Sequence, residues 1–225
     1  MVAILVPANL LNNWLAPQAY VPTCMVTAGL LLPLARRDGC SWSELGLSRA
    51  SVRPGLRWSA ALAGTVLAAL AVAAALPAAR PAFADTRAAR LSGAGVLFHV
   101  LVRIPLGTAL LEEVAFRGVL PAMLGRRRGA WAGVVGSSLL FGLWHVLPSL
   151  GLRNANAAVA DLTGTGPAGT AVVVTGAVLG TAAGGVVLCE LRRRSGSLLA
   201  PFTLHWAFNG LGLLFAWLVT EQRPA

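Results

Sequence analysis

A small set of polar side chains interrupts stretches that are otherwise apolar. Glu113 and Arg117 are four residues apart, as are His205 and Asn209, so each pair would share one face of an α-helix. Glu112 would point about 100° away from Glu113, so Arg117 would not neutralise it. An ionisable group in the bilayer core costs at least about 2.5–3.5 kcal/mol on insertion scales and is usually kept for a function.

These residue types are suited to hydrolysing an amide with water. Glu112 and His145 can hold and deprotonate a water molecule, because a carboxylate in a low-dielectric cavity is a better base. His205 and Asn209 supply N–H donors suited to the oxyanion of a tetrahedral intermediate. Glu112, His145 and His205 are also common types of zinc ligand, so spacing alone leaves both a metal-free mechanism and one with a divalent metal open.

Depth along the membrane normal provides an independent reason to group these residues. Counted at 1.5 Å per residue from the nearest arginine cluster, Glu112, His145, His205 and Asn209 fall within roughly 10 Å of one another. They lie on three different apolar segments, so we expect one site. Phe141 lies one turn before His145 on the same face.

The elements that must position this site are membrane-spanning helices. Of the 225 residues, 56% are hydrophobic and 12% are charged, whereas a soluble domain has about 25% charged residues. This composition excludes a soluble globule and predicts an all-α, polytopic membrane protein that forms a single domain over 1–225. Six spans are expected, or seven if the first 15 residues form one. They lie at about 20–35, 58–76, 93–124, 130–147, 168–188 and 197–219.

The net charge of +10 arises from 18 arginines and no lysine, against eight acidic residues. The arginines lie at the ends of apolar runs without interleaved aromatic residues, which favours a lipid bilayer as partner and no nucleic acid. If 36–57, 125–129 and 191–196 share one side, that side holds eleven arginines against five on the other. We therefore expect an integral protein of a prokaryotic plasma (inner) membrane, with these clusters in the cytoplasm.

Several polar residues are expected to have structural roles. Glu113 and Arg117 alone would form an intrahelical pair, and His99 would be a hydrogen-bonded core residue. Arg103 receives no role. Cys24, Cys40 and Cys189 have no metal-ligand spacing and are expected to be small buried residues.

Three motifs resemble those of one protease family. The stretch from Glu112 to Arg117 resembles the EExxxR motif of the CAAX-protease and bacteriocin-processing (CPBP, or ABI) family of intramembrane endopeptidases, which includes the type II CAAX prenyl proteases. Phe141 to His145 resembles its FxxxH motif, and His205 to Asn209 its HxxxN motif, in the family's order. The stretch 42–47 resembles the family's linker, and the motif-bearing core covers about 90–215.

The resemblance implies an endopeptidase that cleaves peptide bonds of membrane-associated, possibly lipidated, polypeptides. It implies Glu112 as the base and His145 as a residue that positions water. His205 and Asn209 would lie at the oxyanion, and Glu113 and Arg117 would be supporting residues. Two alternatives remain: a non-catalytic immunity or scaffold protein of the same fold, and a small proton-coupled transporter.

Overall fold

The computed structural model describes residues 1–164 and 166–221, and this part of the chain is helical with no strand. Six helices are long and apolar enough to cross a membrane, which confirms the predicted fold class. Most ends lie within four residues of the predicted ones, but the second helix begins nine residues earlier, at Arg49, and the fifth ends seven residues later, at Ser195. Four of the six helices include terminal arginines. The six helices are Pro17–Arg37, Arg49–Ala75, Gly93–Arg128, Ala130–Ser149, Gly166–Ser195 and Leu199–Thr220.

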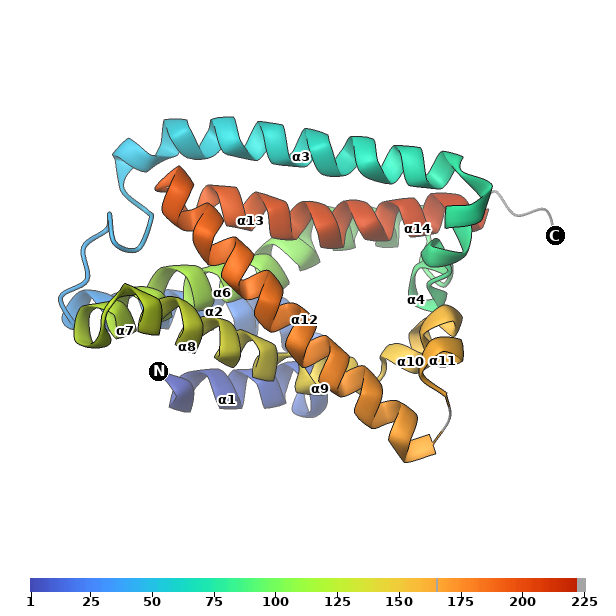
Figure 1. The fold of residues 1–225 in the computed structure, drawn as a ribbon, viewed down its shortest axis with the longest axis horizontal. Helices are drawn as coiled ribbons and strands as arrows, with labels where there is room; N and C mark the ends of the chain where they lie inside the picture. Colours follow the sequence, from blue (N-terminus) through green and yellow to red (C-terminus); the bar gives the residue numbers. More distant parts are fainter. Residues whose placement is uncertain (165, 222–225) are drawn as a thin grey trace.

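The first residues form a short helix and not a seventh span. Helix α1 (Val2–Leu10) continues as a π-helical turn, η1 (Leu11–Leu15). Fourteen residues at 1.5 Å each extend about 21 Å, whereas the hydrocarbon core is about 30 Å thick. This helix lies at the edge of the bundle, where the Asn9 side-chain amide donates to the Trp144 carbonyl at 3.0 Å (Figure 1).

The third span carries the Glu-Glu pair and contains two wide π-helical segments. It runs through α5 (Gly93–Phe98), η5 (His99–Ala109), α6 (Leu110–Glu113), η6 (Val114–Val119) and α7 (Leu120–Arg128). Pro105 lies inside η5 and has no N–H to donate, so it cannot complete a regular α-helical ladder. In a π-helix the hydrogen bond runs between residues five apart, which changes the side chains that share a face.

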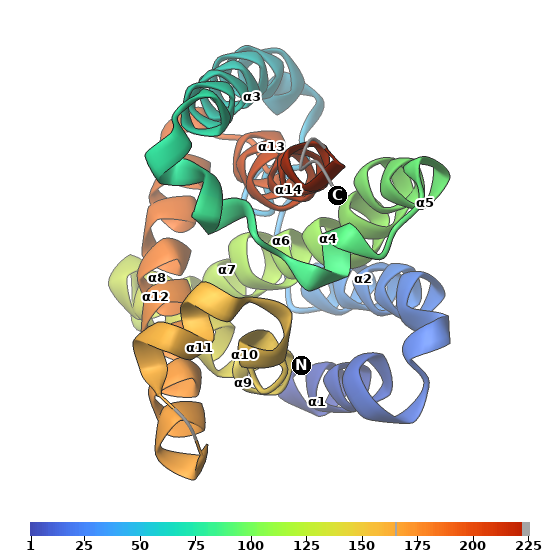
Figure 2. The same cartoon turned by 90° about the vertical axis from the view of Figure 1, so that its right-hand side faces the viewer.

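The remaining helices enclose this span (Figures 1 and 2). Helix α12 runs diagonally across the molecule and packs on α8, while α13 packs on α3. A core of buried apolar residues, including Leu31, Leu111 and Phe116, joins α2 to the third span and α8. The bounds are α2 (Tyr20–Arg37), α3 (Val52–Ala75), α8 (Ala130–Trp144), α9 (Val146–Ser149), α12 (Gly166–Ser195), α13 (Leu199–Trp206), η7 (Ala207–Leu211) and α14 (Gly212–Glu221).

Short helices occupy the segments between the second and third predicted spans and between the fourth and fifth. They close the end of the bundle that faces the viewer in Figure 2, where the Thr86 hydroxyl donates to the Ala155 carbonyl at 3.2 Å. The first segment contains η4 (Pro77–Phe83) and α4 (Thr86–Ala89), and the second contains α10 (Leu152–Ala155) and α11 (Ala157–Thr163).

The opposite end gathers the three arginine clusters, as the sequence predicted. Arg126 pairs with Glu44 at 3.0 Å, and Arg192 donates to the carbonyls of Ser43 and Glu44 at 3.0 Å each. Gly46 has φ +75°, a backbone conformation that favours glycine, and a Cβ there would also overlap the Arg192 guanidinium. The linker is thereby fixed to α7 and α12. The three cysteines are buried and free, as expected.

Candidate active site

Glu112 lies on the short helix α6 between two π-helical segments and is 4% exposed. Its Oε1 atom accepts a hydrogen bond of 3.0 Å from the indole N–H of Trp144, at the end of α8. Its Oε2 atom has no hydrogen-bond partner in the described part of the chain. One oxygen is therefore held in place while the other remains available for chemistry.

Two imidazole rings face this free oxygen. Nε2 of His145 lies 3.9 Å and Nε2 of His205 lies 3.7 Å from Glu112 Oε2. The Nδ1 atom of His145 is 2.8 Å from the Phe141 carbonyl, and that of His205 is 2.8 Å from Glu113 Oε1. Because both oxygens accept, each Nδ1 must donate, and a neutral ring then presents an Nε2 lone pair toward Glu112.

This convergence of acceptors determines what the arrangement can do. The two Nε2 atoms are too far from Oε2 for a direct hydrogen bond, and in the neutral rings all three atoms are acceptors. A water molecule can donate to Oε2 and to an Nε2 at once. Three acceptors around one point thus orient a water molecule, and each of them is a base that can take its proton.

Glu113 and Arg117 form the predicted intrahelical pair, with 3.3 Å between Oε1 and Nη1 and both side chains fully buried. The Arg117 guanidinium carbon also lies 3.8 Å from the centre of the Phe141 ring. Phe141 in turn stacks edge-on against His145, with ring centres 4.6 Å apart. Glu113 additionally holds His205, a cross-helix role that its spacing to Arg117 did not reveal.

Asn209 has no direct contact with Glu112, His145 or His205 among the hydrogen bonds of the described residues. It lies within η7, whose wide turn shifts the register that four-residue spacing would give in an α-helix. It does line a cavity of about 450 Å³ together with both histidines.

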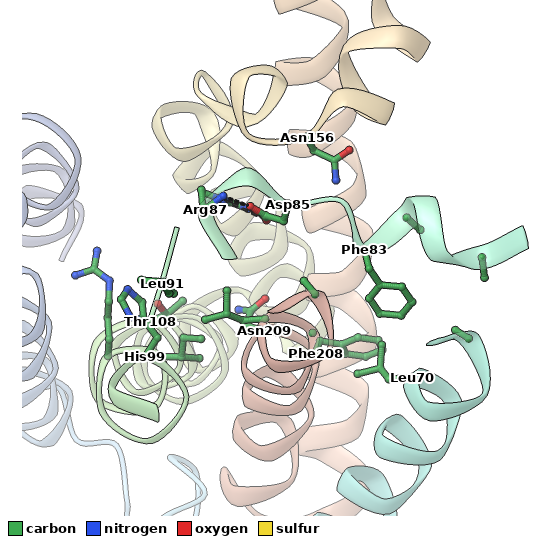
Figure 3. Close-up of a pocket in the computed structure, with 18 residues that line it drawn as sticks. Leu70, Phe83, Asp85, Arg87, Leu91, His99, Thr108, Asn156, Phe208 and Asn209 are labelled. Atoms are coloured by element: carbon green, nitrogen blue, oxygen red, sulfur yellow. Dashed lines mark hydrogen bonds and ion pairs between the residues drawn. The ribbon is translucent and has the colours of Figure 1, made fainter. Parts of the chain in front are cut away.

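A second cavity, of about 790 Å³, shares Asn209 with the first and is drawn in Figure 3. Its polar lining includes His99, Arg103 and Thr108 from η5. Tyr20 binds the Thr108 hydroxyl at 3.0 Å. The sequence analysis gave none of these residues a place at the site.

Trp144 contacts the proposed base, but the sequence analysis did not include it among the site residues. The signal was an indole N–H directly before His145 in an apolar span, since a buried Trp N–H needs an acceptor.

The donor atoms at the centre of the site are of types that bind zinc. Nε2 of both histidines and Oε2 of Glu112 are such ligands, and each Nδ1 has the backing acceptor that metal-bound histidines use. A bound divalent ion would acidify a coordinated water. Within residues 1–164 and 166–221, no three His, Cys, Asp or Glu side chains are grouped closely enough to hold an ion as they stand.

Comparison with known proteins identifies the family of this chain. No curated protein and no solved structure matches the chain. The sequence model of one family, described as type II CAAX prenyl endopeptidase Rce1-like, matches residues 94–211, which is more than half of the chain and contains all three motifs. The chain therefore belongs to the Rce1-like family of type II CAAX prenyl endopeptidases, which are membrane proteases.

Proposed function

We propose that this protein is an intramembrane endopeptidase that hydrolyses membrane-associated polypeptides, including lipidated ones, with Glu112 as the base. The observation that supports this most directly is the free Oε2 of Glu112. This atom is buried and faces the Nε2 atoms of His205 and His145 at 3.7 and 3.9 Å. Family membership implies proteolysis, and this is the point in the fold where a water would be activated.

The proposed reaction begins with a water held between Glu112 and His145. Glu112 takes a proton as the water oxygen bonds to the scissile carbonyl carbon. The Trp144 hydrogen bond to Oε1 keeps Oε2 directed at the water. When the tetrahedral intermediate collapses, the C–N bond breaks and the leaving amine takes the proton from Glu112.

The oxyanion is assigned to His205 and Asn209. His205 can donate through Nε2 only in its doubly protonated form, and the Glu113 carboxylate 2.8 Å from Nδ1 stabilises that charge. The amide of Asn209, on the wall of the same cavity, supplies the second donor. Arg117 pairs with Glu113 at 3.3 Å and is a positioning residue.

The decisive test compares Glu112→Gln with Glu44→Gln, both purified in detergent and assayed on quenched, lipidated peptides. Glu44 is an acid at the arginine-rich end, remote from the histidines. Loss of the base should lower kcat by about 10²–10⁴-fold, whereas Glu44→Gln should cleave like wild type. Full cleavage by Glu112→Gln would refute the proposal. An unchanged cellular phenotype in both Glu112→Ala and His205→Ala would favour a non-catalytic scaffold.

Metal content is measured on the same preparations. Stoichiometric metal together with chelator-sensitive cleavage would reassign Glu112, His145 and His205 as ligands. Cleavage by metal-free protein that Glu112→Gln abolishes would establish the side-chain mechanism.

A further inference from the structure

The third span carries three polar residues at short intervals before Glu112. His99, Arg103, Thr108 and Glu112 follow one another at intervals of four, five and four residues. In a regular α-helix, thirteen residues would leave Glu112 turned about 220° from His99. Residues 99–109 are instead π-helical, and hydrogen bonds between residues five apart bring such intervals onto one face. The first three residues accordingly line the same cavity. His99 and Thr108 are labelled in Figure 3.

Arg103 is the one cation on this cavity wall without an acidic partner among the described residues. The lining contains an ion pair, Arg87 and Asp85, whose charged groups are 2.6 Å apart and neutralise each other. His99 is bound through Nδ1 to the Gly95 carbonyl at 2.8 Å. The Arg103 guanidinium lies over the Tyr20 ring, 4.2 Å from its centre, which orients the cation without cancelling its charge.

An uncompensated guanidinium in a membrane span is costly and calls for an anion from outside the chain. The cavity that Arg103 lines also contains Asn209, which lines the smaller cavity beside both catalytic histidines. A molecule bound near Arg103 would therefore reach toward the reacting atoms, which favours the substrate itself as the source of the anion.

We propose that Arg103 binds a carboxylate of the substrate peptide, a short distance from the scissile bond. This inference depends on the proposed protease function and adds a specificity determinant to it. Arg103 and Glu112 are nine residues apart, at most about 14 Å along the helix. An extended peptide spans about 3.3–3.6 Å per residue, so the carboxylate lies within about four residues of the cleaved bond. A guanidinium suits this role because it can bind both carboxylate oxygens.

The test measures binding separately from cleavage. Glu112→Gln protein, which should not turn over, is titrated with a fluorescent prenylated peptide that has a C-a-a-X ending, as the free acid and as the C-terminal amide. We expect the acid to bind about tenfold or more tightly than the amide, as a charge-assisted contact implies. Adding Arg103→Gln should abolish this preference, and Arg103→Lys should keep part of it. Arg90→Gln, which removes an exposed cation from the same end of the molecule, should change nothing.

A second peptide pair distinguishes the two sources of a carboxylate. It has a C-terminal amide and carries Asp or Asn within the four residues around the cleaved bond. A preference for Asp that depends on Arg103 would assign the contact to a side chain and still support the proposal. Equal binding of acids and amides, including no binding of either, would overturn it, as would a preference that survives in Arg103→Gln protein of wild-type thermal stability.

Cleavage kinetics keep this proposal separate from the proposed function. In protein that retains the native Glu112 and can cleave, Arg103→Gln should raise KM for the acid peptide and leave kcat/KM for the amide peptide unchanged. If wild-type protein binds the acid selectively but cleaves no peptide, the protease assignment fails while the Arg103 site stands.

Discussion

The single hydrogen bond from Trp144 to Glu112 is the residue-scale feature that most directly affects the proposed base. It holds Oε1, so Oε2 is the oxygen left to meet water. Trp144→Phe keeps the aromatic packing against Phe116 but removes the donor. A hydrogen bond to a charged group contributes about 1.5–3 kcal/mol, so kcat should fall by about 10–100-fold.

Trp131→Phe is the matched control, because Trp131 is 79% exposed. Cleavage rates and melting temperatures are compared for both variants. Wild-type kcat in Trp144→Phe would show that the indole serves packing only.

The residues of the three motifs were accessible to sequence reasoning, whereas their partners were not. Charge in an apolar run marks Glu112 and His205 as unusual on any reading of the chain. Trp144 and Tyr20 are aromatic residues that an apolar span tolerates in any case, so their N–H and O–H groups become informative only when the fold shows their acceptors.

At the scale of elements, the Glu113–Arg117 pair joins the third span to α13 through His205. Removing one member of a buried ion pair leaves an uncompensated charge, which typically costs about 3–5 kcal/mol. Arg117→Met should therefore lower the free energy of unfolding by about that amount, measured by denaturant titration in detergent.

The double variant Glu113→Gln/Arg117→Met separates stability from function. It removes both charges, so most of the stability should return, while cleavage stays low because His205 has lost the carboxylate at Nδ1. A double variant with wild-type kcat would show that the pair has no role in positioning His205.

The limits of prediction at this scale come from helix geometry. The arginine clusters mark where apolar segments end, so ten of the twelve ends of the six spans could be located to within four residues, whereas two helices continue further, to Arg49 and to Ser195. The π-helical segments could not, because the sequence analysis assumed 3.6 residues per turn throughout. The wide turns of η5 bring His99, Arg103 and Thr108 onto the wall of one cavity, a grouping that spacing in a regular α-helix does not predict.

At the scale of the whole molecule, Glu44 connects the linker to the membrane helices at the arginine-rich end. The Ser41 N–H, followed by the Ser41 hydroxyl contact and Arg126, lowers the pKa of Glu44 from 4.5 to about 2. A group with a depressed pKa in the folded state stabilises above its unfolded value, so this contribution is complete above pH 4.5 and is lost as the pH falls toward 2. Melting temperature measured against pH should decline less in this range for Glu44→Gln than for wild type, and identical acid limbs would exclude this role.

The orientation of the whole molecule determines the compartment in which a substrate is cleaved. The arginine-rich end should face the cytoplasm, because eleven arginines gather there. The large cavity lies toward the other end, near α4. The native cysteines are buried, so single exposed cysteines can report each side: Ala50→Cys in η3 (Arg49–Ser51) and Ala89→Cys in α4. A membrane-impermeant maleimide should label Ala89→Cys in intact spheroplasts and Ala50→Cys only after lysis.

The opposite labelling would invert the topology and open the large cavity to the cytoplasm, where prenylated proteins are processed. The arginine-rich end would then face the non-cytoplasmic side, contrary to the positive-inside rule. Access of a cytoplasmic substrate to the cavity would explain that exception. With the expected labelling, the Arg103 cavity takes its peptides from the non-cytoplasmic side. A soluble cytoplasmic protein then could not be the substrate, and secreted or membrane-anchored peptides become the set to screen.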